Sequence, residues 1–237
     1  QRPWYTHYAD DVAPDLETVP FEHLPAMIRH SGSAYSGTIA FTQCMPNGMN
    51  GSLTYAQVDA LSDEFAAYLR EVVGLAQGDR VAVQMPNCLA YPVVAFGVMK
   101  AGCVLVNTNP LYTPTEMVHQ FSDSGAKALV VIDMFADRLP EVLPKTSIET
   151  VVTVRIGEFF PPVIAGVIRM VQKFCNRSLP AITVEHTAFQ AALGAGRAAT
   201  SAEALAGYLE GIGPDSIAAL QYTGGTTGVS KGAMLSH

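Results

Sequence analysis

The chain has 237 residues, of which 49% are hydrophobic and only 15% are charged, and its formal net charge is −7. This balance argues against a nucleic-acid partner, because phosphate backbones are bound by basic surfaces and the chain has no run of Lys or Arg. The cysteines Cys44, Cys88, Cys103 and Cys175 lack the Cys-x-x-Cys and His spacings of zinc sites. We interpret them as reduced core thiols, which are typical of a reducing compartment.

The first half of the chain alternates between strand and helix patterns. A short strand is expected at 39–43, and a turn follows with Gly48, Asn50 and Gly51. Thr54 and Gln57 have the spacing of a capping box, and the apolar residues after them recur at helical spacing until Gly74. A strand at 80–85, a helix at 89–100 that is apolar on nearly all sides, and a strand at 103–106 come next.

A second capping box opens the next helix. Thr113 and Glu116 flank Pro114 at the first helical position, and the helix is expected to end near residue 124. The continuous apolar run 128–132 is typical of a central parallel strand, and another strand is expected at 151–154. Strands that alternate with helices of this length predict an α/β fold: a doubly wound, mostly parallel sheet with helices on both faces.

Two segments of the second half allow different interpretations. The segment 161–174 predicts an amphipathic helix, either a surface helix packed on the core or a basic helix that contacts a membrane. The segment 191–213 is rich in Ala and Gly, and we expect a mobile, solvent-facing connection there.

The most informative segment lies at the end of the chain. A strand expected at 216–222 leads into Thr-Gly-Gly-Thr-Thr-Gly-Val-Ser-Lys-Gly. Glycines let a backbone turn closely around a ligand, and exposed N–H groups of such a loop form an anion site. Thr223, Thr226, Thr227 and Ser230 add hydroxyl donors, and Lys231 adds a positive charge suited to phosphate. The loop therefore predicts binding of nucleotide phosphates; the alternative is a flexible linker, which rarely connects two apolar segments.

The loop is not a Walker A motif. Counted from Gly225, Ser230 stands where that motif requires its second glycine, and Gly232 replaces the hydroxyl residue after the lysine. The stretch from Tyr222 to Gly232 instead resembles the signature loop of the adenylate-forming enzymes: acyl-CoA synthetases, peptide-synthetase adenylation domains and luciferases. The segments 78–87, 107–113 and 123–127 are similar to other parts of that family. The Gly224-Gly225 pair points to its bacterial long-chain fatty acid–CoA ligases.

This resemblance covers most of residues 50–237 and implies the N-terminal portion of the large domain of such an enzyme. Residues 1–50 would form an N-terminal extension with the first strands, and 51–237 an N-terminal α/β subdomain that ends at the phosphate loop. The rest of the large domain and a small C-terminal domain would be absent. The resemblance also implies a helix directly after the loop.

The implied reaction is an ATP-dependent, AMP-forming ligation of a long-chain fatty acid to coenzyme A, with Mg2+ as cofactor. The β- and γ-phosphates of ATP would be held by Thr223, Gly224, Gly225, Thr226, Thr227, Gly228, Ser230 and Lys231. Thr226 would contact Mg2+ indirectly. Catalytic residues are expected downstream of His237, so the chain alone should be inactive.

The resemblance further implies a homodimer when full length, and a cytoplasmic protein with a peripheral membrane contact through 161–174 at the inner face of the cell membrane. Two alternatives to the long-chain ligase stay open. The acid could be an aryl or medium-chain acid, or the chain could be a non-catalytic nucleotide-binding module.

Overall fold

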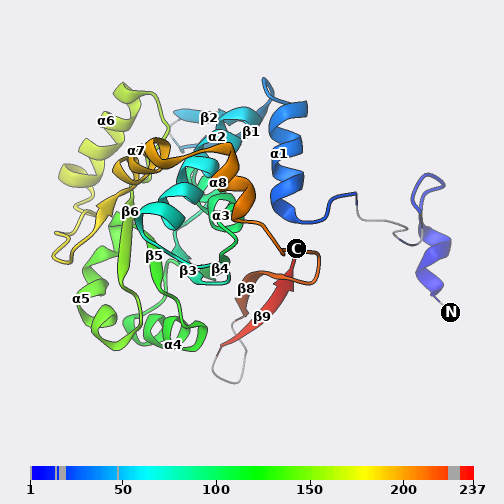
Figure 1. Ribbon diagram of the computed structural model, residues 1–237. Coiled ribbons are helices and arrows are strands. Elements are labelled where there is room, and N and C mark those ends of the chain that lie inside the picture. Colours follow the sequence, from blue (N-terminus) through cyan, green and yellow to red (C-terminus); the bar gives the residue numbers. More distant parts are fainter. Residues whose placement is uncertain (1, 14, 16–19, 47, 224–229) are drawn as a thin grey trace.

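The computed structural model describes residues 2–13, 15, 20–46, 48–223 and 230–237. Its centre is a sheet with the strand order β7-β6-β5-β3-β4-β8-β9 (Figure 1). The strands are β3 (Arg80–Gln84), β4 (Val104–Thr108), β5 (Ala128–Ile132), β6 (Thr150–Val154), β7 (Thr187–Ala188), β8 (Ile217–Thr223) and β9 (Lys231–Ser236). β3 pairs in parallel with both β4 and β5, and among the described strands of this sheet only β8 and β9 pair antiparallel. The prediction of a mostly parallel sheet is confirmed.

Helices cover both faces of this sheet. The helices are α1 (Leu24–Ala34), α2 (Tyr55–Ala67), α3 (Ala90–Lys100), α4 (Pro114–Ser124), α5 (Leu139–Val142), α6 (Pro162–Met170), α7 (Phe189–Ala199) and α8 (Ala202–Gly207). One core cluster joins α2, α3 and α7 through residues such as Phe65, Val98 and Leu193. The other joins α4 and α5 through Phe121 and Leu139. The two groups lie on opposite sides of the strands (Figure 1), as a doubly wound fold requires.

Both predicted capping boxes are present. The hydroxyl oxygen of Thr54 accepts a hydrogen bond from the backbone N–H of Gln57. The side-chain oxygen of Gln57 accepts one in return from the backbone N–H of Thr54. Thr113 and Glu116 make the same reciprocal pair at the start of α4. Gly125 ends α4 in the left-handed region at φ 62°, a conformation that costs glycine little. The sequence signals therefore place α4 correctly at both ends.

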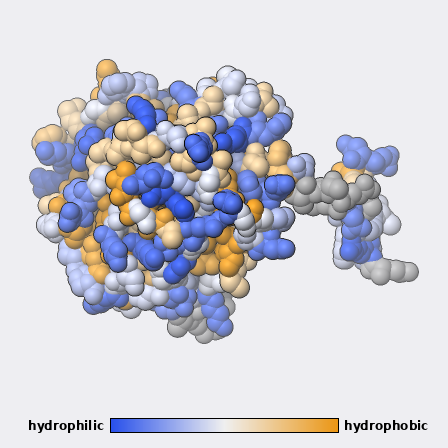
Figure 2. Space-filling model, in the orientation of Figure 1, coloured by the Kyte–Doolittle hydropathy of each residue, from blue (hydrophilic) through white to orange (hydrophobic). Residues whose placement is uncertain are grey.

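A small antiparallel sheet precedes the main one. β1 (Ile39–Cys44) pairs with β2 (Asn50–Thr54), so residues 50 and 51 belong to a strand and not to the predicted turn. The expected division of the chain at residue 50 falls inside β2. α1 was missed because it lacks a standard cap: the ring of His23 accepts from the backbone N–H of Ala26. Before it, a short 3-10 helix (Pro3–His7) lies apart from the body of the fold, as both full views show (Figures 1 and 2).

The expectation of a solvent-facing connection at 191–213 is wrong. Most of this segment lies in α7 and α8, and Ala192, Leu193 and Leu205 are buried in the core. The small residues that suggested a linker let α7 approach α2 closely, because a Cβ on Gly196 would lie only 1.8 Å from the carbonyl oxygen of Glu64. Gly196 is thus explained by tight helix packing.

The expectation of a helix after the phosphate loop is also wrong. Residues 231–236 form β9, which pairs with β8 from Thr223 and Lys231 back to Ile217 and Ser236. Antiparallel pairing with β8 satisfies backbone groups that a helix of this length would leave unpaired. The hairpin stays poorly covered, as the sequence suggested: Ile217 is 41% and Met234 71% exposed.

The cysteines are free thiols, and their burial differs from the expectation. Cys88 and Cys103 are buried, whereas Cys44 and Cys175 are exposed, so only two of them are core residues. Burial raises the pKa of Cys103 to about 12, which leaves it unreactive at neutral pH. Among the described helices, none is both long and apolar enough to cross a membrane.

Candidate nucleotide-binding site

The two ends of the predicted phosphate loop are held in a hairpin at the edge of the sheet. Thr223 is the last residue of β8 and pairs with Lys231, the first residue of β9. Thr223 and Lys231 are exposed, and Ser230, which directly precedes Lys231, is half-buried. The predicted site residues Gly224, Gly225, Thr226, Thr227 and Gly228 lie outside the described residues. The structure thus brings Thr223, Ser230 and Lys231 together at the mouth of the loop.

Helix α4 contacts the chain on both sides of the loop. The hydroxyl of Tyr222 donates to Asp123 Oδ2 at 2.5 Å. On the other side, Nε2 of His119 lies 3.1 Å from the carbonyl oxygen of Ser230. Burial and the neighbouring Asp123 carboxylate raise the pKa of Tyr222, so its hydroxyl stays protonated and able to donate.

Tyr222 also explains the glycine that follows the lysine. A Cβ on Gly232 would lie 2.9 Å from the Tyr222 ring, which is closer than carbon atoms approach without displacement. The two residues are register partners in the β8–β9 hairpin. A larger residue at 232 would push the ring away from Asp123 or push β9 away from β8.

A cavity of about 490 Å³ lies beside the base of the loop. It opens at the carboxyl ends of β3, β4 and β8, the edge where ligands of parallel α/β sheets usually bind. A chain of polar side chains crosses it: Tyr91 donates to Asn107 Oδ1 at 2.7 Å, and Asn107 donates to Gln221 Oε1 at 2.8 Å. The cavity is therefore polar and lies against the strand that leads into the loop.

Two buried glutamines support this edge from the side of α4. Gln84 donates to the carbonyl oxygen of Asn109, and Gln120 donates to that of Asn107. Both glutamines are fully buried, and their Oε1 atoms have no hydrogen-bond partner among the described residues. These bonds tie β3, through Gln84, and α4, through Gln120, to the end of β4, which stands next to β8.

The described residues contain no group of three or more His, Cys, Asp or Glu side chains that could hold a metal ion. The proposed indirect Mg2+ contact, Thr226, lies outside the described part of the chain. Mg2+ binds phosphate oxygens and water readily, and in nucleotide sites it is often held by the substrate with few protein ligands. The residues seen here are compatible with that mode and supply no separate cage.

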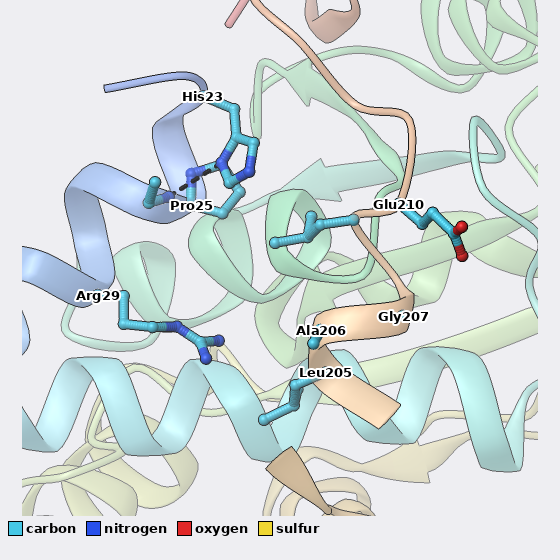
Figure 3. Close-up of a pocket in the computed structure, with 9 residues that line it drawn as sticks. His23, Pro25, Arg29, Leu205, Ala206, Gly207 and Glu210 are labelled. Carbon is cyan, nitrogen blue, oxygen red and sulfur yellow. Dashed lines mark hydrogen bonds between the residues drawn. The ribbon is translucent and has the colours of Figure 1, made fainter. Parts of the chain in front are cut away.

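A second cavity, of about 520 Å³, lies between α1 and α8 and is lined by none of the predicted loop residues (Figure 3). Its charged residues have local roles: the His23 ring caps α1, and Arg29 lies 3.5 Å from Asp63. In Figure 3 the Glu210 carboxylate points away from His23 and Arg29. Charged groups therefore do not converge in this cavity, and it is a weaker candidate than the site at the loop.

The sequence located the loop and missed its supports. His119 has no Ser or Cys partner at a motif spacing in the sequence, which indicates a surface or packing residue, and its half-buried position with a bond to Ser230 fits that description. Asp123 and Asn107 were recognised only as parts of the family resemblance. Their roles depend on β8 lying beside β4, a pairing of strands more than 100 residues apart that no local pattern reveals.

Comparison with known proteins agrees with this assignment. The model of the family described as AMP-binding enzyme matches residues 28–237. A long-chain-fatty-acid–CoA ligase of Salmonella typhimurium is 37% identical over 99% of the chain, and the chain spans about 40% of the length of that relative.

Solved structures share the fold. A crystal structure of a long-chain-fatty-acid-CoA ligase from Archaeoglobus fulgidus superposes with a TM-score of 0.66 at 22% identity, over 94% of this chain and 38% of that one. An anthranilate CoA ligase in complex with anthranoyl-AMP gives a TM-score of 0.66 at 18% identity, over 92% of this chain and 36% of that one. The family match over residues 28–237 and the glycine-rich loop between β8 and β9 together show that the chain belongs to the AMP-binding enzyme family.

Proposed function

We propose that the full-length protein is an ATP-dependent, AMP-forming ligase that joins a long-chain fatty acid to coenzyme A. A carboxylate oxygen of the acid attacks the α-phosphorus of ATP, and pyrophosphate leaves with the electron pair of the broken P–O bond. The thiol sulfur of coenzyme A then attacks the acyl carbonyl carbon and expels AMP. The main support for this proposal is the family match, together with the position of the two ends of the loop at the carboxyl edge of the sheet.

In this proposal the loop residues bind the β- and γ-phosphates of ATP. The hydroxyl, backbone N–H and ammonium groups of Thr223, Gly224, Gly225, Thr226, Thr227, Gly228, Ser230 and Lys231 surround them. Such groups lower the barrier by positioning the phosphates and neutralising their charge. Mg2+, with Thr226 as an indirect contact, would add a second positive charge on the same oxygens. We propose that the catalytic residues follow His237 in the sequence of the full-length protein. Residues 51–237 are then one part of a larger domain.

The test is the loss of the lysine charge in the full-length protein. Lys231→Ala should lower acid-dependent pyrophosphate release about 10²–10³-fold, the usual effect of removing one charge-stabilising donor. Lys145→Ala is the matched control, because Lys145 is also an exposed lysine and, among the described residues, its ammonium group pairs with Glu141 one turn away on the surface. Unchanged turnover of Lys231→Ala at limiting and saturating ATP would remove Lys231 from the site. Steady acyl-CoA formation by the 237-residue chain alone would contradict the placement of the catalytic residues.

The choice of acid rests on the named relatives. The Salmonella relative at 37% identity is a long-chain-fatty-acid–CoA ligase, which supports a long-chain acid. An aryl or medium-chain acid is the alternative, and a non-catalytic nucleotide-binding module is the runner-up. Pyrophosphate release measured with palmitate, octanoate and benzoate separates the first two. Nucleotide binding without pyrophosphate release for any acid would favour the module.

We also propose a peripheral membrane contact through the segment 161–174. The helix packs through Ile168, with Ile164 and Ala165 partly buried against the core. Other apolar side chains of the segment face outward: Val163 is 79%, Met170 54% and Phe174 68% exposed. The segment carries two basic residues, Arg169 and Lys173, and no acidic residue in a chain of net charge −7. Exposed apolar side chains beside basic ones suit an anionic lipid surface.

Vesicle binding tests this contact. The full-length protein should sediment with phosphatidylglycerol vesicles and much less with phosphatidylcholine vesicles. The double variant Lys173→Glu with Phe174→Ser should lose this binding, and Lys145→Glu should keep it. Equal binding by all three proteins would exclude the segment as the contact. A homodimer and a cytoplasmic location complete the proposal and are tested by sedimentation equilibrium and cell fractionation.

A further inference from the structure

Helix α4 contacts the chain at both ends of the phosphate loop, one helical turn apart. Asp123 accepts the hydroxyl hydrogen of Tyr222, which directly precedes Thr223. His119 bonds to the carbonyl group of Ser230, which directly precedes Lys231. Residues four apart lie on the same face of a helix, so one ridge of α4 reaches both ends of the loop.

We propose that α4 positions the phosphate loop, and that His119 and Asp123 are positioning residues which set the affinity for the phosphates of ATP. The inference rests on the proposed function of the loop and adds two residues that the loop sequence does not contain. Neither residue needs to touch ATP. They act by fixing the places where the loop leaves β8 and joins β9.

The helix is rigid enough to serve this purpose. Its first turn has the reciprocal capping box, and Met117 and Phe121 are fully buried against the sheet. Gln120 adds a bond of 2.7 Å to the carbonyl oxygen of Asn107 in β4. Because α4 is fixed to the sheet, the ends of the loop are fixed to it as well. Binding groups that are held in place lose less conformational freedom when a ligand binds, so fixed positions of residues 223, 230 and 231 favour tighter binding of phosphate.

The chemistry of each contact predicts which substitutions matter. A carbonyl oxygen only accepts, so Nε2 of His119 carries the hydrogen, in the neutral ring as well as in the imidazolium. The amide nitrogen of a glutamine can take nearly the same place, so His119→Gln should retain the contact. Tyr222 is buried and Asp123 is exposed. Tyr222→Phe therefore removes the contact and leaves a carboxylate that water can solvate.

The experiment uses the full-length protein and three measurements: acid-dependent ATP–pyrophosphate exchange, amide hydrogen exchange of residues 223–231, and urea unfolding. His119→Ala and Tyr222→Phe should each raise the KM for ATP about 5-fold, as expected from the loss of one hydrogen bond of about 1 kcal/mol. The kcat at saturating ATP and the KM for the acid should change less than about 2-fold by the same reasoning. The loop amides should exchange faster while the urea midpoint stays the same.

Controls separate positioning from general support of the fold. His119→Gln should behave like the parent protein. Thr115→Ala should also have no effect: Thr115 is exposed one turn before His119, and none of the side-chain hydrogen bonds of the described residues involves it. Asp123→Ala combined with Tyr222→Phe should raise the KM no further than either change alone, because both remove the same contact.

Faster loop exchange with an unchanged urea midpoint would support the proposal. Unchanged loop exchange, or a lower urea midpoint with equal effects on both KM values, would overturn it, because α4 would then only stabilise the fold. If the parent protein shows no ATP–pyrophosphate exchange, the proposed function fails. The amide exchange of the loop then decides the positioning role by itself.

Discussion

Two glycines of α7 provide a matched test of how this helix packs. Gly194 is exposed, and a Cβ there would meet no atom within 4 Å. Gly196 is buried, and a Cβ there would lie 1.8 Å from the carbonyl oxygen of Glu64 and 3.0 Å from the backbone nitrogen of Tyr68. Both obstacles are backbone atoms of the neighbouring helical segment, so no side-chain rotation can relieve the overlap. The same substitution should therefore have opposite effects two residues apart.

Gly194→Ala should stabilise the protein by about 0.5–1 kcal/mol, because alanine restricts the unfolded chain and favours helix. Gly196→Ala has the same benefit but forces α7 away from α2, and overpacking of this kind costs about 1–3 kcal/mol or more. We expect a net loss of about 2 kcal/mol, so the two variants should differ by about 3 kcal/mol.

Thermal unfolding followed by circular dichroism measures this difference. A domain of this size shifts its midpoint by about 2–4 °C per kcal/mol, so the two midpoints should lie about 6–12 °C apart. A Gly196→Ala variant as stable as Gly194→Ala would refute the reasoning. The segment 191–213 would then be the solvent-facing connection that its composition suggested.

Two further predictions concern charged groups. Lys100 is fully buried and bonds to Asp59 and Asp63 at 2.5 and 2.8 Å. Lys100→Met should lower the free energy of unfolding, measured in urea, by about 3 kcal/mol, because Asp59 loses its cation and Asp63 keeps the more distant Arg29 at 3.5 Å. A loss below about 1 kcal/mol would contradict this. Hydrogen bonds from the backbone and side chain of Thr113 lower the pKa of Glu116. The contribution of the Glu116 carboxylate to the stability of the fold is therefore complete above its usual pKa of 4.5 and is lost as the pH falls through the lowered pKa. Glu116→Gln should remove this part of the acid sensitivity, which urea unfolding at pH 7 and at pH 3 would detect.

Local signals predicted what depends on neighbouring residues. The apolar run 128–132 is the strand β5 with both bounds correct, and the box at Thr113 and Glu116 defines the start of α4. The predictions were wrong where contacts between residues far apart in the sequence determine the secondary structure. Residues 231–236 are a strand because β8 offers them an antiparallel partner, and Gly196 is in a helix because α2 lies against it.

The same limit applies to the candidate site. The composition of the loop indicated phosphate binding, since glycines, hydroxyls and a lysine have that chemistry wherever they occur together. The bond between Tyr222 and Asp123 could not be predicted, because it requires the relative placement of β8 and α4. Each of these residues is ordinary by itself, and only the tertiary structure gives the pair a role.

The position of β8 in the sheet has a consequence for synthesis on the ribosome. β3, β4, β5 and β6 emerge first and can pair at once, but β4 meets β8 only when residues 219–221 have been made. Until then the outer edge of β4 presents unpaired backbone groups beside the apolar residues Leu105 and Val106, which is an aggregation hazard for a nascent chain. The hairpin of β8 and β9 is thus paired with the sheet later than the other described strands. Ribosomes stalled before and after residue 221 should carry chains that differ sharply in chaperone binding.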